Sequence, residues 1–194
     1  MGAHWEHWAG ERVRLRAIEQ SDGPQMLANE RDGEAERNGG WLQHPRSTES
    51  TRKRIEERAG GQADLSCMLA ITPLDSDAMV GTVSARHAVP KHGTIEYGIN
   101  VYRDHWRKGY AREAALLLLR HYFDELGFLK VEAGVWAYNE QSMAFHRAFG
   151  FLEEARLREA IVTRGKRYDE LRFGMLAEEF NAVHADWLQR WSGP

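Results

Sequence analysis

The sequence predicts a mixed α/β (α+β) fold built on one central sheet. Three observations predict it: alternating apolar segments in the first half, a strand-helix-strand-helix order in the middle, and two alternating segments near the end. A right-handed crossover is expected through the middle helix. The chain has 194 residues, of which 42% are hydrophobic and 28% charged, so we expect residues 1–194 to form a single globular domain.

The first third alternates strand and helix signals. Val13 to Ala17 alternates as a strand does, and Ser21-Asp22-Gly23-Pro24 is typical of a helix start. Residues 31–40 are polar and contain glycine, so a loop is expected there. Residues 47–59 suggest a helix, and because acids alternate with its basic run Arg52-Lys53-Arg54, the pattern favours a solvated face over a nucleic-acid patch.

The rest of the chain predicts strands around two further helices. Strands are expected over 65–71, 79–89, 94–102, 130–138, 155–163 and 171–177, and a turn is expected at Gly165-Lys166-Arg167. Helical spacing runs from Ala111 to Leu126, and Asn139 begins a shorter helix that ends at Phe149-Gly150. We expect residues 178–194 to form an amphipathic C-terminal helix and residues 1–10 to be a flexible N-terminal segment.

Composition excludes several classes of protein. The net charge of −3 argues against a general nucleic-acid binder, which needs a basic surface. The single cysteine, Cys67, cannot form an internal disulfide or a cysteine-rich zinc site. The apolar runs are too short to span a bilayer, and the start does not resemble a signal peptide. We therefore expect a cytoplasmic protein with no membrane, metal or nucleic-acid partner.

The stretch Trp106-Arg107-Lys108-Gly109-Tyr110-Ala111 combines positive charge with little bulk where a helix begins. Helix N-termini expose unpaired N–H groups, and glycine lets a ligand come close to the main chain. Arg107, Lys108 and Arg112 could add charged contacts. The stretch therefore suggests a pyrophosphate site, although a basic loop before an ordinary helix explains it equally well. The motifs of P-loop and dinucleotide sites are absent from the sequence.

Residues 94–115 resemble the acyl-CoA-binding segment of the GNAT superfamily of N-acetyltransferases, whose loop has the pattern [QR]-x-x-G-x-[GA]. Trp106 replaces the first residue of that pattern, as in the branch that acts on the N-termini of ribosomal proteins. Asn139-Glu140-Gln141-Ser142 and Phe149-Gly150-Phe151 resemble the family's N-x-x-S…G-F segment. The resemblance covers roughly residues 11–180. It implies a mostly antiparallel sheet of about seven strands flanked by helices and splayed between the fourth and fifth strands.

The resemblance also implies acetyl-CoA as co-substrate, with no metal, and direct transfer of the acetyl group to a primary amine. The main chain of the strand end is expected to pair with pantetheine, the loop to hold the pyrophosphate, and the next helix to contact pantetheine. The implied cofactor-binding residues are Ile99, Asn100, Val101, Trp106, Arg107, Lys108, Gly109, Tyr110, Ala111, Arg112, Asn139 and Ser142.

Three residues are candidates for catalysis. Glu96 lies on the strand that faces the acetyl group in the family and is the candidate base, although it also fits an exposed residue of an alternating strand. Asn139, Ser142 and His146 share one helix face at spacing i, i+3, i+7. Ser142 and His146 are therefore candidates for the acid that protonates the CoA thiolate. As alternatives, Ser142 could bond its own first turn, Asn139 could be only an N-cap, and His146 could be a surface histidine.

The acceptor is expected to be a protein N-terminus, such as that of a ribosomal protein, or a small-molecule amine. An enzyme that modifies antibiotics or polyamines, a non-catalytic CoA-binding regulatory module and an RNA- or ribosome-associated protein remain alternatives. The C-terminal helix could dock on its own domain or on a second subunit, so a homodimer also stays open.

Overall fold

In the computed structural model, residues 6–40 and 65–191 are described, together with 42, 44, 47, 49, 50, 52, 53 and 56 between them. The helix expected over 47–59 therefore falls largely outside the described residues. Within these ranges, no helix has both the length and the apolar character needed to cross a membrane.

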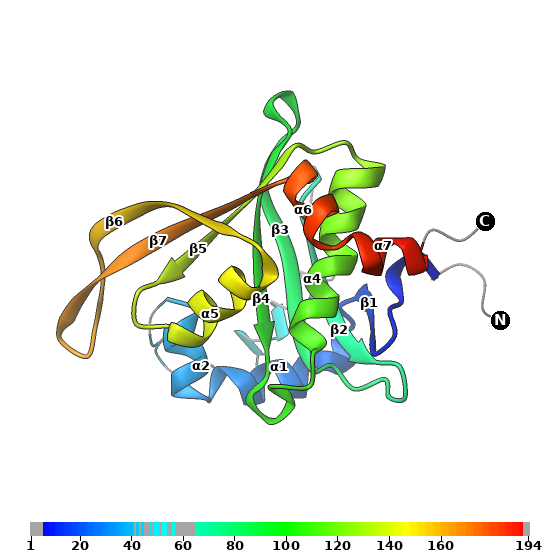
Figure 1. The fold of residues 1–194 in the computed structure, drawn as a ribbon. Coiled ribbons are helices and arrows are strands. Elements are labelled where there is room, and N and C mark those ends of the chain that lie inside the picture. Colours follow the sequence, from blue (N-terminus) through cyan, green and yellow to red (C-terminus); the bar gives the residue numbers. More distant parts are fainter. Residues whose placement is uncertain are drawn as a thin grey trace.

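Seven strands form one sheet in the order β1-β2-β3-β4-β5-β7-β6, and every neighbouring pair is antiparallel except β4 and β5 (Figure 1). This is the mixed sheet that the sequence predicts. The strands are β1 Val13–Ala17, β2 Cys67–Pro73, β3 Gly81–Val89, β4 Thr94–Val101, β5 Lys130–Trp136, β6 Leu152–Thr163 and β7 Lys166–Leu176.

Helices cover both faces of the sheet. They are α1 Gly23–Glu30, α2 Gly33–Asn38, α4 Tyr110–Arg120, α5 Glu140–Phe149, α6 Ala177–Val183 and α7 Ala185–Trp191, and a π-helical turn, His121–Glu125, extends α4. The crossover between the parallel strands β4 and β5 runs through α4, as expected. Short 3-10 turns occur at Glu6–Trp8, Gln20–Asp22, Pro90–His92 and Arg103–His105.

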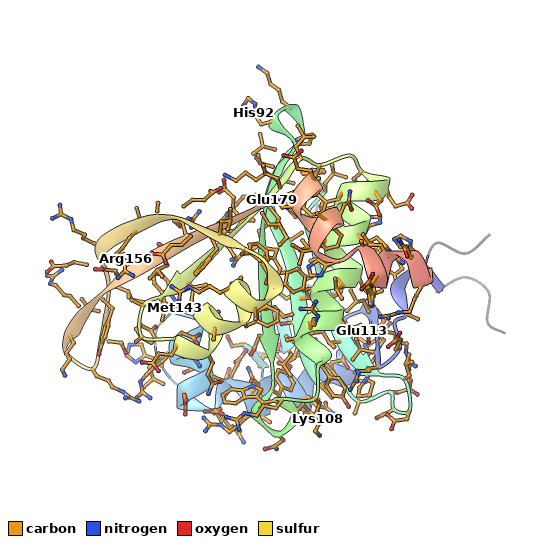
Figure 2. All side chains as sticks on the ribbon, in the orientation of Figure 1. His92, Lys108, Glu113, Met143, Arg156 and Glu179 are labelled. Atoms are coloured by element: carbon orange, nitrogen blue, oxygen red, sulfur yellow. The ribbon has the colours of Figure 1, made fainter. Side chains whose placement is uncertain are left out.

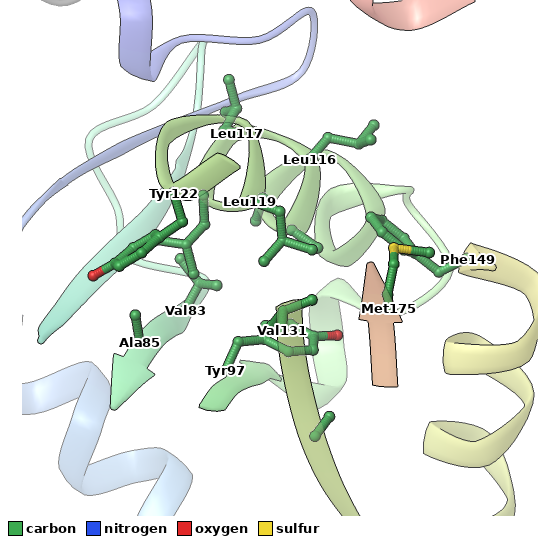
Figure 3. Close-up of a cluster of buried hydrophobic side chains, with 14 of the residues drawn as sticks. Val83, Ala85, Tyr97, Leu116, Leu117, Leu119, Tyr122, Val131, Phe149 and Met175 are labelled. Carbon is green, nitrogen blue, oxygen red and sulfur yellow. The ribbon is translucent and has the colours of Figure 1, made fainter. Parts of the chain in front are cut away.

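The main hydrophobic core lies between the sheet and α4, α5 and α6, and Leu117 and Leu119 of α4 are fully buried. Leu119 points from the helix toward the strands, near Tyr97 and Val131, whereas Leu117 lies on the other side of the helix (Figure 3). Burial of each such leucine contributes roughly 1.5–3 kcal/mol. A smaller cluster on the opposite face joins Met26 of α1 to Ala70 of β2. Because side chains alternate along a strand, Tyr97 of β4 faces the main core and Glu96 faces the α1 side.

Strands β4 and β5 are paired only at their beginnings. The paired residues are Thr94, Ile95 and Glu96 of β4 and Lys130, Val131 and Glu132 of β5. Beyond this point β4 continues to Val101 and β5 to Trp136, and the two strands separate (Figure 1). We call the gap between the unpaired parts of these strands the splay. It confirms the division of the sheet expected between the fourth and fifth strands.

Three expected elements differ from the structure. Residues 31–40 contain α2 instead of a loop, because the Asp32 side chain accepts hydrogen bonds from the Glu34 and Ala35 amides and caps the helix. The last hairpin turns tightly at Arg164 and Gly165, both with positive φ, so residues 166 and 167 already lie in β7. The C-terminal helix breaks in two at His184, where the main chain leaves helical geometry and the ring turns toward Phe149.

Candidate active site

The main chain of β4 presents alternate residues to the splay. Tyr102 N–H donates to the Val80 carbonyl at 2.8 Å, and a Cβ on Gly81 would lie 2.3 Å from the Asn100 carbonyl oxygen, so these groups face β3. The Val101 carbonyl points the other way and accepts the Trp106 indole N–H at 2.6 Å. By this alternation, the main-chain groups of Ile99 and the Val101 N–H face the splay.

The loop 106–112 ends in four main-chain donors. Gly109 is the N-cap of α4, with a φ of 81° and no side chain to cap the helix, and the first helical bond joins Glu113 N–H to the Gly109 carbonyl. In the described part of the chain, the amides of residues 109–112 donate no hydrogen bond. Because these amides lie at the positive end of the helix dipole, they can bind an anion.

The side chains of the loop divide into two groups. Arg107 and Lys108 are exposed, and Figure 2 shows Lys108 where the chain enters α4. Trp106 points toward β4, and the Arg103 guanidinium lies 5.5 Å from the centre of its ring. The Arg112 guanidinium donates to His184 Nδ1 at 3.3 Å. Arg107 and Lys108 are therefore the cations best placed to meet a ligand on the loop.

Glu113 ties the loop to the start of β1. Its carboxylate accepts hydrogen bonds from the amides of Glu11, Arg12 and Val13 at 2.7, 2.8 and 2.8 Å, although only 5% of the residue is exposed. The chain before β1 passes so close that a Cβ on Gly10 would lie 2.3 Å from the carboxyl carbon. Figure 2 shows Glu113 on α4. The sequence gives no local signal for the role of this glutamate, because its partners lie about a hundred residues away.

The same contact places Arg12 beside the loop. The guanidinium of Arg12 lies 3.4 Å from the Lys108 carbonyl oxygen and packs near Gly109. Together with its neighbours it lines a shallow depression, whose residues are Glu11, Arg12, Leu74, Asp75, Lys108 and Tyr110. In the sequence, Arg12 alternates with Arg14 and Arg16 of β1. This pattern does not indicate that Arg12 differs in role from the other two arginines.

Glu96 lies on the α1 face, at the last paired position before the splay. One carboxylate oxygen is 2.7 Å from Arg86 Nη2, and the other is 3.5 Å from Arg172 Nη2 and from His87 Nδ1. The side chain is 18% exposed. The alternative of an exposed residue on an alternating strand is therefore corrected: Glu96 is a largely covered carboxylate held between two arginines.

Asn139 and Ser142 form the first turn of α5. The Asn139 side-chain oxygen accepts the Ser142 amide at 3.0 Å, so Asn139 is an N-cap. The Ser142 hydroxyl lies 3.4 Å from His146 Nδ1. The helix therefore brings Asn139, Ser142 and His146 together, as their spacing predicts.

His146 is buried, with 4% of the residue exposed, which corrects the view that it lies on the surface. Its Nδ1 is 2.7 Å from the Ser142 carbonyl and must donate to it, so its Nε2 accepts from the Tyr97 hydroxyl at 3.0 Å. Burial lowers the pKa of His146 and raises that of Tyr97. The ring is therefore neutral, and its one N–H is already used.

Helix α2 spans the end of the splay. At its start, Asp32 accepts two hydrogen bonds from Arg103, which follows β4, at 2.7 and 2.8 Å, and this contact lowers the pKa of Asp32. At its end, the hydroxyl of Tyr138, a residue that follows β5, donates to the Arg37 carbonyl and lies 3.4 Å from the Gly40 carbonyl oxygen. One short helix thus connects the ends of both separated strands.

Comparisons with known proteins agree on one family. A family model described as "Acetyltransferase (GNAT) domain" matches residues 12–152. The "SPbeta prophage-derived uncharacterized N-acetyltransferase YokL" of Bacillus subtilis is 34% identical over 178 residues, covering 92% of this chain and 97% of that protein. The "Putative ribosomal N-acetyltransferase YdaF" of the same organism is 26% identical over 174 residues, covering 88% and 94%.

Solved structures share the fold. The crystal structure of a putative acetyltransferase from T. thermophilus superposes with a TM-score of 0.79 at 28% identity and covers 98% of this chain and 99% of that one. The agreement therefore extends beyond the residues matched by the family model to the C-terminal hairpin and helices.

Proposed function

Because this chain belongs to the GNAT family of acetyltransferases, we propose that it transfers the acetyl group of acetyl-CoA directly to the α-amine of a protein N-terminus. The relatives are named N-acetyltransferases, and acetyl-CoA is the donor that the family uses.

The splay, together with the free amides of the 109–112 turn, is the observation that carries this proposal. A diphosphate can accept hydrogen bonds from those amides, and Gly109 leaves its approach clear of a Cβ. From there, the pantetheine arm can enter the splay and pair with the main chain of Ile99 as an added strand would. The geometry favours Ile99 and the Val101 N–H over Asn100, whose carbonyl faces β3.

Further contacts to the donor follow from the site. Arg107 and Lys108 would add charge at the diphosphate, with Tyr110, Ala111 and Arg112 contributing main-chain amides. Asn139 and Ser142 would meet the pantetheine from α5. Trp106 would act indirectly, by holding the end of β4 through the Val101 carbonyl.

Glu96 is proposed as the base. When bound, acetyl-CoA supplies an activated thioester whose carbonyl carbon is attacked by a neutral amine. Glu96 would accept the proton of that amine, through a water molecule, from the α1 face of the sheet. An N-terminal amine has a pKa of about 7.7–8.0, whereas a lysine has one of about 10.4. Near pH 7 a larger share of the N-terminal amine is therefore already neutral, so it needs less help from a carboxylate base.

We propose that the departing thiolate takes its proton from the Ser142 hydroxyl, which would take up a proton from solvent in the same step so that no alkoxide is left. This hydroxyl is partly buried at the start of α5. His146 has no free N–H in the resting site, so it would act by holding Ser142 and Tyr97 in place. This assigns His146 a positioning role in place of the direct role that the resemblance implied.

An amine panel tests the proposal. CoA release would be measured with peptides that have a free N-terminus and with N-terminally acetylated peptides whose amine is a lysine side chain. A polyamine and an aminoglycoside complete the panel. We expect the highest kcat/KM with free N-termini, a preference that the relative named as a ribosomal acetyltransferase supports. Preference for a small amine would contradict the acceptor, and acetyl-CoA binding without transfer to any amine would indicate a non-catalytic module.

A further inference from the structure

The ion pairs around Glu96 come from both sides of the strand that carries it. Arg86 reaches it from the neighbouring strand β3 at 2.7 Å. Arg172 reaches it at 3.5 Å from β7, which is two strands away in the sheet order. Since neighbouring strands lie about 4.8 Å apart, Arg172 must cross the whole width of β5 to make this contact.

Gly134 of β5 makes that crossing feasible. It is the residue directly opposite Arg172 in the β5–β7 register. A Cβ there would lie 3.1 Å from Arg172 Nη1 and 2.3 Å from Glu170 Oε1, so both side chains lie across the main chain at this glycine. Glu170 also accepts a hydrogen bond from Arg172 at 2.9 Å, which directs the guanidinium toward β4.

We propose that Arg172 is a positioning residue for Glu96, aimed across Gly134 by Glu170, and that it holds the carboxylate at the edge of the splay. This inference rests on the proposed role of Glu96. With Arg86 on one oxygen and Arg172 on the other, the carboxylate is fixed from two sides. Without Arg172, the ion pairs left to Glu96 among the described residues are those with Arg86 and His87, and both would draw it toward β3 and away from the splay.

The surrounding charges give the sign of the expected pH effect. Glu96 faces Arg86 and His87 on β3, Glu132 and its partner Lys130 on β5, and Glu170 and Arg172 on β7. Removing Arg172 leaves the carboxylates of Glu132 and Glu170 without that cation. Because a cation that favours charged carboxylates is then missing at the edge of the splay, the acid limb of the pH–rate profile should move up.

The test is a double-mutant cycle in kcat/KM against pH, with the best amine of the panel as acceptor. The variants are Arg172→Met, Glu96→Gln and the double variant. Arg156→Met is the matched control, because Arg156 of β6 also bridges two carboxylates, Glu153 and Asp169, but lies away from the splay (Figure 2). Arg172→Met should shift the acid limb upward and also lower kcat/KM about tenfold on the pH plateau, because Arg86 and His87 then draw the carboxylate away from the splay. It should add less than twofold to Glu96→Gln, because its effect passes through that carboxylate.

Gly134→Ala provides a second, independent variant if Arg172→Met does not fold. Its methyl group displaces two flexible side-chain ends, so the fold should persist while the acid limb shifts in the same direction. Equal profiles for Arg172→Met and Arg156→Met, or an undiminished effect of Arg172→Met in the Glu96→Gln background, would overturn the proposal. Either result leaves wild-type acetyl transfer intact, whereas absence of transfer by the wild type would refute the proposed function itself.

Discussion

His184 is buried where α6 meets α7, against the rings of Phe149 and Phe180, and 2% of it is exposed. Burial, and next the charge of Arg112, lower its pKa to about 4. Its Nε2 is enclosed and has no hydrogen-bond partner among the described residues. A proton on this ring would therefore be a buried charge beside a guanidinium.

The stability of the protein should consequently fall in mild acid. An unfolded histidine binds a proton near pH 6.5, whereas folded His184 binds one only near pH 4, so the unfolded state gains protons first as the pH falls. Between pH 7 and 5 this difference should remove on the order of 1 to 2 kcal/mol from the free energy of unfolding. Urea unfolding of the wild type and of His184→Phe at both pH values measures it. Equal losses in the two proteins would refute this role of His184.

For single residues, the sequence predicts which side chains of one helix lie together better than it predicts contacts between separate elements. The spacing of Asn139, Ser142 and His146 correctly placed them together. The burial of His146 was not predictable, because it depends on Tyr97, 49 residues earlier in the chain. A period of seven residues indicates a shared helix face but not what that face packs against.

At the scale of elements, α4 connects the candidate site to the N-terminal segment. Its first turn presents the free amides, and Glu113, in the next position, binds three amides of residues 11–13. Farther along, His7 and Trp8 pack against His121, so the chain before β1 follows the helix. The position of the loop 106–112 relative to the sheet therefore depends on this carboxylate.

Glu113→Ala should destabilise the fold by about 2–4 kcal/mol, because three buried or half-buried amides lose their acceptor. Glu140→Ala is the control: this glutamate also lies near a helix start but is exposed, and its loss should cost less than about 1 kcal/mol. Chemical denaturation of the two variants measures the difference. A loss at Glu113 no greater than that at Glu140 would show that the contact does not hold the helix.

Element boundaries followed local signals closely where those signals were strong. Asn139 and Gly150 bound α5 as their capping preferences predict. Helix α2 was missed because its six residues are mostly polar and form no apolar stripe. The contacts that stabilise it include the cap at Asp32, the ion pair of Asp32 with Arg103 and the hydrogen bond from Tyr138 at its end. Short helices of this kind depend on tertiary contacts, which a local pattern does not contain.

At the scale of the whole molecule, one face of the sheet is apolar and the other carries ion pairs. Helices α4 and α5 cover the apolar face, and the ion pairs of Glu96 and Arg172 lie on the other, with the splay between β4 and β5 connecting them. A donor held at α4 and an amine approaching from the α1 face would meet at that gap. The order of strands could not be derived from periodicity, since it depends on long-range pairing, and only the resemblance to a family predicted the splay.

Two glycine substitutions test whether the main chain at 109–112 binds the diphosphate of acetyl-CoA. Gly109→Ala and Gly165→Ala each place alanine at a positive φ, 81° and 71°, and so share a conformational cost of roughly 1 kcal/mol. Gly165 lies in the β6–β7 turn with open space around it. The measurement is the ratio of kcat/KM for acetyl-CoA to that for S-acetyl-pantetheine, which lacks the diphosphate. Gly109→Ala should lower this ratio about tenfold, equivalent to about 1.4 kcal/mol, and Gly165→Ala should leave it unchanged. An unchanged ratio in Gly109→Ala would show that these amides do not bind the diphosphate.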